Sequence, residues 1–188
     1  HGEFIMLGMY ATIWSVNALY LDPFMSIPLI LGLFFLFGIL VERIIIRHTI
    51  GAPHVVQIFA TVGLSIVLSN AILFFFKADY HYLKTAYTES MIYLGPLVIS
   101  LPRLLAFIIA LFLTGMLLFF VKGTYAGKAI RATAQNREAA VLMGINVNRI
   151  YMLTMGIGAA SVGVAGNLLV QIYPVFPSVG ANFVVIAF

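Results

Sequence analysis

The 188-residue chain is 63% hydrophobic, only 9% of its residues are charged, and its mean hydropathy is +1.10. A soluble domain is closer to half apolar and carries about a quarter charged residues, so burial in water does not account for this composition, whereas a lipid environment does. The net charge of +4 rests on ten Lys and Arg, which is too few for a nucleic-acid partner, and the absence of Cys excludes disulfides, thiolate nucleophiles and cysteine metal sites.

Apolar runs that are long enough to cross a membrane recur along the chain. A helix needs about 20 apolar residues to span a hydrocarbon core of ~30 Å. The sequence predicts five such helices and the start of a sixth, at residues 4–21, 25–41, 55–76, 101–121, 150–172 and 182–188. The prediction is an all-α polytopic membrane protein, a bundle of transmembrane helices in a single domain over residues 1–188. Because the chain opens at His1 and stops inside an apolar run, we expect a fragment of a longer protein.

The Lys and Arg residues predict the orientation, since cytoplasmic loops carry more of them than external loops do. Threading the predicted spans puts seven on one side, which is then cytoplasmic, and three on the other. The seven are Arg43, Arg47, Lys122, Lys128, Arg131, Arg137 and Arg149, and the three are Lys77, Lys84 and Arg103. The loop 78–100 is then external, where its Tyr80, Tyr82, Tyr87 and Tyr93 suit the membrane interface. A threading error of one helix would invert everything that follows it.

Polar residues within the spans suggest a translocation path or contacts between helices. Thr61, Ser65 and Ser69 repeat every four residues and share one face of the third span, beside Asn70. Asn167 lies near the external end of the fifth span, where it either touches substrate or bonds a headgroup or a loop. Hydrogen bonding between helices is the alternative for the stripe, and packing is the favoured interpretation of the small-residue pairs Gly156/Ala160 and Ala159/Gly163.

Ionisable groups are scarce within the membrane part. Glu3 stands at the beginning of the first span, where the helix dipole favours a carboxylate. No ionisable residue is expected at the centre of any span, which argues against a proton-driven carrier. His48, His54 and His81 lie on different loops, so neither a metal site nor a cofactor is predicted, and no enzyme motif is present.

The cytoplasmic loop 122–149 is predicted to contain one helix over residues 128–143 that does not cross the membrane. Its alanines favour a helix, Gly144 is a left-handed terminator, and Asn146 is a cap for the next span. Arg131 and Arg137 are expected to face water or headgroups. Glu138 has no opposite charge at helical spacing, so its partner lies on another chain or it is simply solvated. Residues 123–129 imitate a phosphate-binding loop but lack its spacing and hydroxyl, so any ATP must be hydrolysed by a different chain.

The segment from Glu138, Ala139 and Ala140 to Gly144 resembles the EAA-x-x-x-G coupling loop of ABC importer permeases. Further segments resemble, in order, branched-chain amino acid permeases of the LivH type: 1–3, 60–65, 131–146, 158–166 and 173–188. Residues 47–50 and Ile186 depart from that pattern. The resemblance implies that the loop helix docks on an ATPase, with Glu138, Ala139, Ala140, Gly144, Arg131 and Arg137 as coupling residues.

The resemblance also implies partners and a location. It implies a homologous permease subunit, two cytoplasmic ATPase subunits, a periplasmic substrate-binding protein, and a multi-pass position in the lipid of a bacterial or archaeal inner membrane. The expected activity is import of branched-chain amino acids. The alternatives are uptake of urea, short-chain amides or a sugar by a permease of the same superfamily, or else a channel or a membrane-embedded enzyme.

Overall fold

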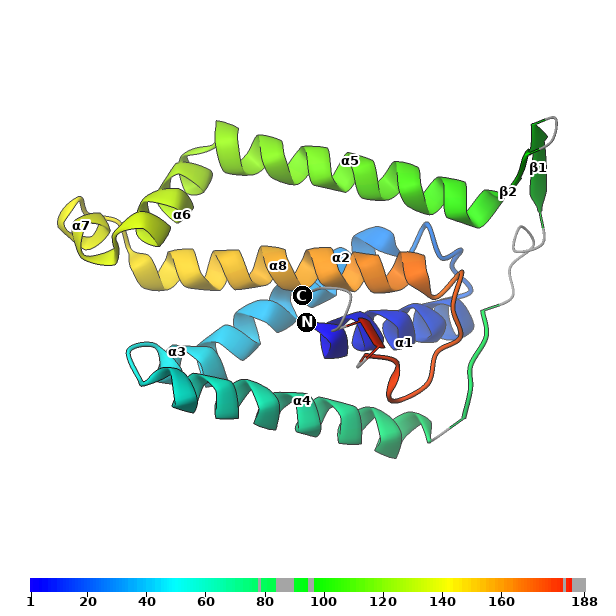
Figure 1. Cartoon of the computed structure of the whole chain (residues 1–188), viewed down its shortest axis with the longest axis horizontal. Helices are drawn as coiled ribbons and strands as arrows, with labels where there is room; N and C mark the ends of the chain where they lie inside the picture. Colours follow the sequence, from blue (N-terminus) through cyan, green and yellow to red (C-terminus); the bar gives the residue numbers. More distant parts are fainter. Residues whose placement is uncertain (78, 84–89, 95–96, 181, 184–188) are drawn as a thin grey trace.

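The computed structural model describes residues 1–77, 79–83, 90–94, 97–180 and 182–183 of the chain. These residues form an elongated bundle of helices with one short β-hairpin (Figure 1). The helices are α1 (Gly2–Leu19), α2 (Ile27–Val41), α3 (Arg47–Thr49), α4 (His54–Phe76), α5 (Leu101–Gly123), α6 (Tyr125–Gln135), α7 (Arg137–Leu142) and α8 (Val147–Leu169). A π-helical turn, η1 (Glu42–Ile46), joins α2 to α3, and the strands are β1 (Met91–Leu94) and β2 (Leu97–Ser100). The predicted all-α class is confirmed.

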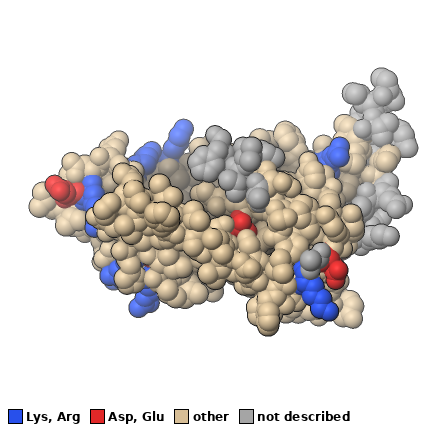
Figure 2. Space-filling model, turned by 60° about the horizontal axis from the view of Figure 1, so that its bottom comes forward, with Lys and Arg blue, Asp and Glu red and all other residues tan. Residues whose placement is uncertain are grey.

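The bundle has two ends, which we call the α7 end and the hairpin end (Figure 1). The α7 end holds α6, α7, α3 and the first turns of α4 and α8, and the hairpin end holds β1, β2 and the last turns of α4 and α8. Basic side chains gather at the α7 end, and the face shown in Figure 2 is almost free of charge between the two ends. The seven Lys and Arg that were predicted to share one side of the membrane all lie on elements of the α7 end or beside them.

Four helices are long and apolar enough to cross a membrane. They are Ile27–Thr49, which joins α2, η1 and α3, and the helices α4, α5 and α8. These four match the second to fifth predicted spans. The last of them begins at Val147, earlier than predicted, because the Oδ1 atom of Asn146 accepts a hydrogen bond from the backbone N–H of Arg149 at 3.2 Å.

The first predicted span coincides with α1, which is not one of those four helices. Its first turn lies near the middle of α8 and not at either end of the bundle (Figure 1). Gly180, in the segment after α8, packs on this turn, since a Cβ atom there would lie 2.9 Å from the carbonyl oxygen of Gly2. That α1 crosses the membrane stays a prediction, and of the predicted sixth span only residues 182 and 183 are described.

The centre of the bundle is α8, which packs closely against α1 and α2 through small residues. A Cβ atom on Gly8 of α1 would lie 2.6 Å from the carbonyl oxygen of Gly163, and one on Gly38 of α2 would lie 2.6 Å from the Cβ atom of Ala159. Gly156 faces the ring of Phe35 on α2. The small residues of α8 therefore serve helix packing, which is the interpretation that the sequence favoured for them.

The predicted single helix over residues 128–143 is wrong, because the structure has two helices here. Asn136 adopts an extended conformation (φ −153°, ψ 106°) between α6 and α7. Its Oδ1 atom accepts a hydrogen bond from the backbone N–H of Ala139 at 3.0 Å and so caps α7. An Asn side chain competes with the helix for backbone donors, and here it breaks the helix to start a new one.

The hairpin was not predicted. Its strands pair antiparallel, with Met91 opposite Ser100 and Leu94 opposite Leu97. The preceding loop is fixed separately, because His81 and Val175 exchange backbone hydrogen bonds of 2.9 and 3.0 Å. Tyr80 and Tyr82 are exposed there, as the interfacial assignment requires, while Lys84 and Tyr87 lie outside the described residues.

Candidate functional site

Helices α6 and α7 project beyond the first turn of α8 and form the tip of the molecule at the α7 end (Figure 1). The Thr124 hydroxyl caps α6 by accepting a hydrogen bond from the N–H of Gly127 at 3.0 Å. Gly144 ends the segment with φ +79°, a backbone conformation that favours glycine. Capping at each break thus fixes a short segment whose direction differs from that of the long helices.

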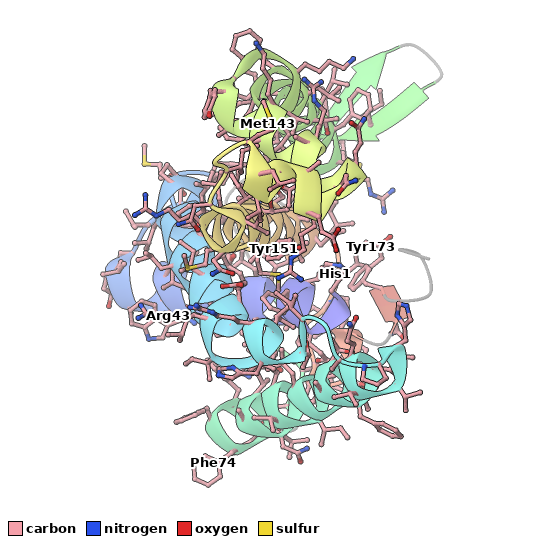
Figure 3. The ribbon with its side chains drawn as sticks, turned by 90° about the vertical axis from the view of Figure 1, so that its left-hand side faces the viewer. His1, Arg43, Phe74, Met143, Tyr151 and Tyr173 are labelled. Carbon is pink, nitrogen blue, oxygen red and sulfur yellow. The ribbon has the colours of Figure 1, made fainter. Side chains whose placement is uncertain are left out.

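Apolar side chains are exposed at this tip, and we call Val141, Leu142 and Met143 together the apolar crown. Val141, Leu142 and Met143 are 55%, 87% and 81% exposed, and Figure 3 shows Met143 at the end of the molecule that faces the viewer. Ala140, one residue earlier, is buried at 3% exposure and accepts a hydrogen bond from the N–H of Ile145 at 3.0 Å. One side of α7 therefore seats on the bundle, and the other presents apolar surface outward.

The predicted coupling residues surround that apolar crown. Glu138 and Ala139 are exposed in the first turn of α7, and Arg131 is exposed on α6. Arg137 is exposed too, but its guanidinium lies 5.9 Å from the centre of the Tyr151 ring on α8, within the range of a cation–π contact. The structure thus brings the predicted set together on one projection, and it adds the exposed apolar residues, which the sequence interpretation had passed over.

A second polar group lies at half depth in the bundle. Ser65, the middle residue of α4, donates a hydrogen bond of 3.1 Å to Oε1 of Glu3. The other carboxylate oxygen of Glu3 is buried and has no hydrogen-bond partner among the described residues. Glu3 reaches this depth because α1 begins inside the bundle and carries it in its first turn, outside the predicted first span over residues 4–21.

Glu3 borders a cavity of about 400 Å³, which we call the Glu3 cavity. This cavity lies on the side of Glu3 that faces the hairpin end. Ser69 and Asn70 of α4 line it, and so do Leu73 and Tyr80. The structure therefore brings three of the predicted path residues to one place, since Ser65 bonds Glu3 at its base. Thr61 lies apart, exposed on α4, with its hydroxyl bonded to the carbonyl of Ile58 at 2.9 Å.

Asn167 does not line this cavity. It is completely buried, and its side-chain amide donates hydrogen bonds to the carbonyl of Pro23 at 3.0 Å and to the hydroxyl of Ser26 at 2.8 Å. Pro23 and Ser26 belong to the turn between α1 and α2. Of the two roles left open for Asn167, the structure shows the bond to a loop.

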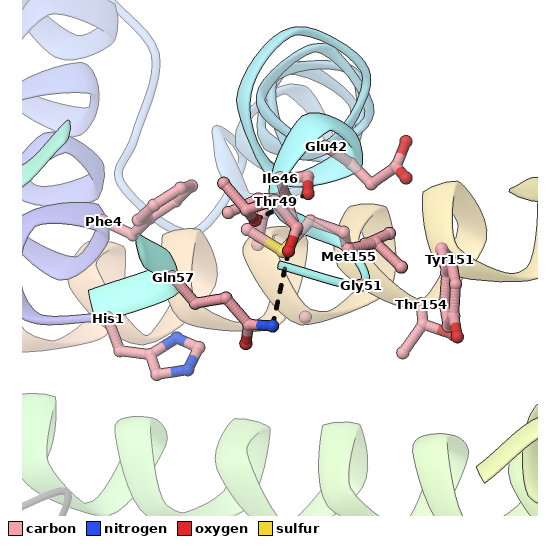
Figure 4. A pocket seen from close by; sticks show the side chains of 13 residues that line it. His1, Phe4, Glu42, Ile46, Thr49, Gly51, Gln57, Tyr151, Thr154 and Met155 are labelled. Carbon is pink, nitrogen blue, oxygen red and sulfur yellow. Dashed lines mark hydrogen bonds between the residues drawn. The ribbon is translucent and has the colours of Figure 1, made fainter. Parts of the chain in front are cut away.

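A larger cavity of about 560 Å³ lies toward the α7 end, and we call it the Glu42 cavity (Figure 4). It is bounded by the first turn of α1, by η1 and α3, by the start of α4 and by the first half of α8. Phe4, Ile46 and Met155 give it apolar walls. Gln57 closes one side, with its amide donating hydrogen bonds to the carbonyls of Ala52 at 3.1 Å and Thr49 at 3.3 Å.

The first turn of α1 separates the two cavities. His1 and Phe4 line the Glu42 cavity, whereas Glu3 lines the Glu3 cavity. One cavity opens toward each end of the bundle, with a single helical turn and its Ser65 contact between them.

Sequence reasoning missed Glu42 as a site residue. It stands beside Arg43 at the end of an apolar run, and a charged pair in that position indicates a helix end at the membrane surface. In the structure the helix continues through η1, so that Glu42 is buried while Arg43 is exposed. The pair itself was the available sequence signal. On a helix that continues past Glu42 and Arg43, adjacent side chains point in different directions, so only one of the two can face water.

Comparisons with known proteins agree with one another. The family described as "Branched-chain amino acid transport system / permease component" matches residues 1–188. Over 193 residues the chain is 29% identical to BraD of Pseudomonas aeruginosa, a high-affinity branched-chain amino acid transport system permease protein, which covers 96% of this chain and 63% of the relative. Two LivH proteins of the same description, from Salmonella typhimurium and Escherichia coli K12, are 28% identical over 200 residues with the same coverage. The chain thus spans about 63% of the length of these curated relatives, and no solved structure matches it.

Proposed function

The chain belongs to the permease-component family of branched-chain amino acid transport systems, and on that premise we propose that it forms part of the transmembrane path of an ATP-driven importer for branched-chain amino acids. The relatives named BraD and LivH are described as permease proteins of high-affinity branched-chain amino acid transport systems. The four long apolar helices support a multi-pass position in the membrane, which we assign to the bacterial or archaeal inner membrane.

The observation that carries the proposal is the apolar crown on α7. Val141, Leu142 and Met143 expose apolar surface at a tip that is surrounded by charged residues and lies outside the long helices. Such a tip in water costs free energy unless another protein covers it. We propose that a cytoplasmic ATPase subunit receives it, with Glu138 beside the contact as the charge whose partner lies on that subunit.

We assign the remaining proposed partners to the two ends of the bundle. We propose that the hairpin end faces the periplasm and receives the amino acid from a binding protein, and that a homologous permease subunit completes the path. A second ATPase subunit serves that other permease half. ATPase closure then moves α7, and α7 moves the start of α8 through the short link 143–146.

The proposed path runs through the two cavities. The amino acid enters the Glu3 cavity, passes the first turn of α1, and leaves through the Glu42 cavity toward the α7 end. Along the part toward the hairpin end, hydroxyl and amide groups come from Ser65, Ser69 and Asn70. The part toward the α7 end has apolar walls from Phe4 and Met155.

The docking contact can be tested by removing the apolar crown in the full-length protein. The double substitution Leu142→Ser and Met143→Ser should weaken ATPase binding about tenfold or more, because burying a side chain of this size contributes roughly 1.5–3 kcal/mol. Co-purification of the ATPase and leucine uptake by reconstituted vesicles measure the effect. Met25→Ser is the matched control for ATPase binding, since Met25 is 70% exposed near the opposite end. Unchanged ATPase binding in the double variant contradicts the docking assignment.

A further inference from the structure

Glu42 is the first residue of the π-helical turn η1. Such turns insert one extra residue into a helix and often occur at functional sites. Here the turn lets the apolar helix α2 continue to Thr49 while the Glu42 side chain is held inside the bundle, at 1% exposure. Figure 4 shows Glu42 reaching from this helix toward α8, on the side where Tyr151 and Thr154 lie.

Within the described part of the chain, Glu42 has no partner of opposite charge. Both of its carboxylate oxygens are buried and have no hydrogen-bond partner among the described residues. The neighbouring cations Arg43 and Arg47 are exposed and do not line the cavity. A buried carboxylate without a partner is costly, so a group that supplies positive charge at this point would bind favourably.

The cavity around Glu42 is suited to a small organic cation. Its volume of about 560 Å³ falls within the roughly 300–1,000 Å³ of small-molecule sites. Among the described residues that line it, Glu42 is the sole acidic one and none is Lys or Arg. Phe4, Ile46 and Met155 offer apolar walls beside the carboxylate. Such a site combines one fixed negative charge with space for an aliphatic chain.

We propose that the Glu42 cavity binds a primary ammonium group that carries a branched aliphatic chain, with the Glu42 carboxylate as the acceptor of the ammonium. Identifying this ligand with the α-ammonium end of the transported amino acid rests on the proposed function. In that setting Glu42 offers the cargo its last polar contact before release at the α7 end. The cation compensates the buried carboxylate only while the cargo is present, so the site binds and releases without a permanent ion pair.

The charge in the cavity can be measured with a cysteine reporter at Thr154. This residue lines the cavity and is exposed, and the 188 residues contain no other cysteine. In the full-length protein carrying Thr154→Cys as its sole cysteine, the rates of modification by a cationic (ethylammonium) and an anionic (ethylsulfonate) methanethiosulfonate reagent are compared. Glu42→Gln should lower the cation-to-anion rate ratio about tenfold, because a unit charge a few ångström away acts oppositely on the two reagents.

Two matched variants complete this experiment. Glu42→Asp keeps the charge and should keep most of the ratio, and Asp79→Asn removes an exposed carboxylate near the hairpin end and should leave the ratio unchanged. The proposal is overturned if Glu42→Gln leaves the ratio as it was, or if Asp79→Asn lowers it equally.

Ligand protection gives an independent readout that needs no change at Glu42. Isopentylamine should slow modification of the Thr154→Cys protein, whereas 4-methylpentanoate, which has a similar chain and a carboxylate in place of the ammonium, should not. Equal protection by both compounds, or protection by neither, overturns the ammonium site even if Glu42→Gln fails to fold. The outcome is separable from the proposed function, because loss of the leucine-import assignment would show in uptake while these rates would remain as expected.

Discussion

A single serine hydroxyl joins two helices at the centre of the bundle. Ser65 on α4 donates to Glu3 on α1, whose second carboxylate oxygen has no partner among the described residues. The Ser65 hydroxyl therefore supplies a hydrogen bond to a partly buried carboxylate, and a charge removed from water is costly unless it is hydrogen-bonded. Of the two interpretations that the sequence left open for the stripe on α4, Ser65 shows the contact between helices, and lining of a path stays a prediction.

Removing that hydroxyl gives a prediction about stability. Ser65→Ala should lower the free energy of unfolding by about 1–2 kcal/mol, because it leaves the Glu3 carboxylate without its donor. Thermal unfolding in detergent measures the change. Thr114→Ala is the control, since the Thr114 hydroxyl bonds only the carbonyl of Ala110 in its own helix, at 2.8 Å. Equal losses in the two variants contradict a special role for Ser65.

The conformation and contacts of a residue could be predicted where its surroundings are set by residues close to it in the sequence. Gly144 and Asn146 take the predicted conformation and cap because both depend on the adjoining backbone. Glu3 and Glu42 could not be placed from sequence, because their surroundings come from helices far away along the chain. Asn167 was left between two roles for the same reason, and the structure shows its bond to Ser26 in the turn between α1 and α2.

At the scale of elements, close contact between helices depends on glycines at particular turns. Gly38 and Gly32 lie on the same helix, α2. A Cβ atom on Gly38 would lie 2.6 Å from the Cβ atom of Ala159 and 2.6 Å from the carbonyl oxygen of Met155, whereas nothing lies within 4 Å of one on Gly32. Gly38 thus sets the distance between α2 and α8, and Gly32 does not.

This difference predicts opposite effects for the same substitution. Gly38→Ala should destabilise the protein by about 1–3 kcal/mol through overpacking, and Gly32→Ala should be neutral or stabilise it by up to about 1 kcal/mol through helix propensity. Denaturation of the two purified variants measures the difference. A stable Gly38→Ala protein would show that α2 and α8 can separate without cost.

The elements themselves could largely be predicted, since apolar length alone locates the four helices of the described residues that are long and apolar enough to cross a membrane. Two local features escaped prediction. Alanine-rich composition concealed the break at Asn136, where one capping hydrogen bond outweighs the helix propensity of the residues around it. The hairpin escaped because its strands are short and lie within a loop that was assigned only by its position.

At the scale of the whole molecule, charge and exposure predict that the two ends lie on opposite sides of the membrane. Leu142 at the α7 end and Tyr82 near the hairpin end are 87% and 68% exposed. In the full-length protein, a membrane-impermeant maleimide added to intact spheroplasts should label the Tyr82→Cys variant. It should label the Leu142→Cys variant only after the membrane is opened. The reverse pattern would mean that the predicted orientation is inverted.

The backbone pair of His81 and Val175 has a mechanical consequence for this bundle. It joins the segment that follows α4 to the segment that follows α8 by two backbone hydrogen bonds. The hairpin ends of those two helices are therefore connected to each other. At the α7 end the first turns of α4 and α8 have no such strap among the described residues. Two helices that are joined at one end can move most, relative to each other, at the opposite end. If α7 is displaced, as the proposed coupling requires, we expect the movement to widen or narrow the Glu42 cavity at the α7 end while the hairpin ends of α4 and α8 keep their spacing.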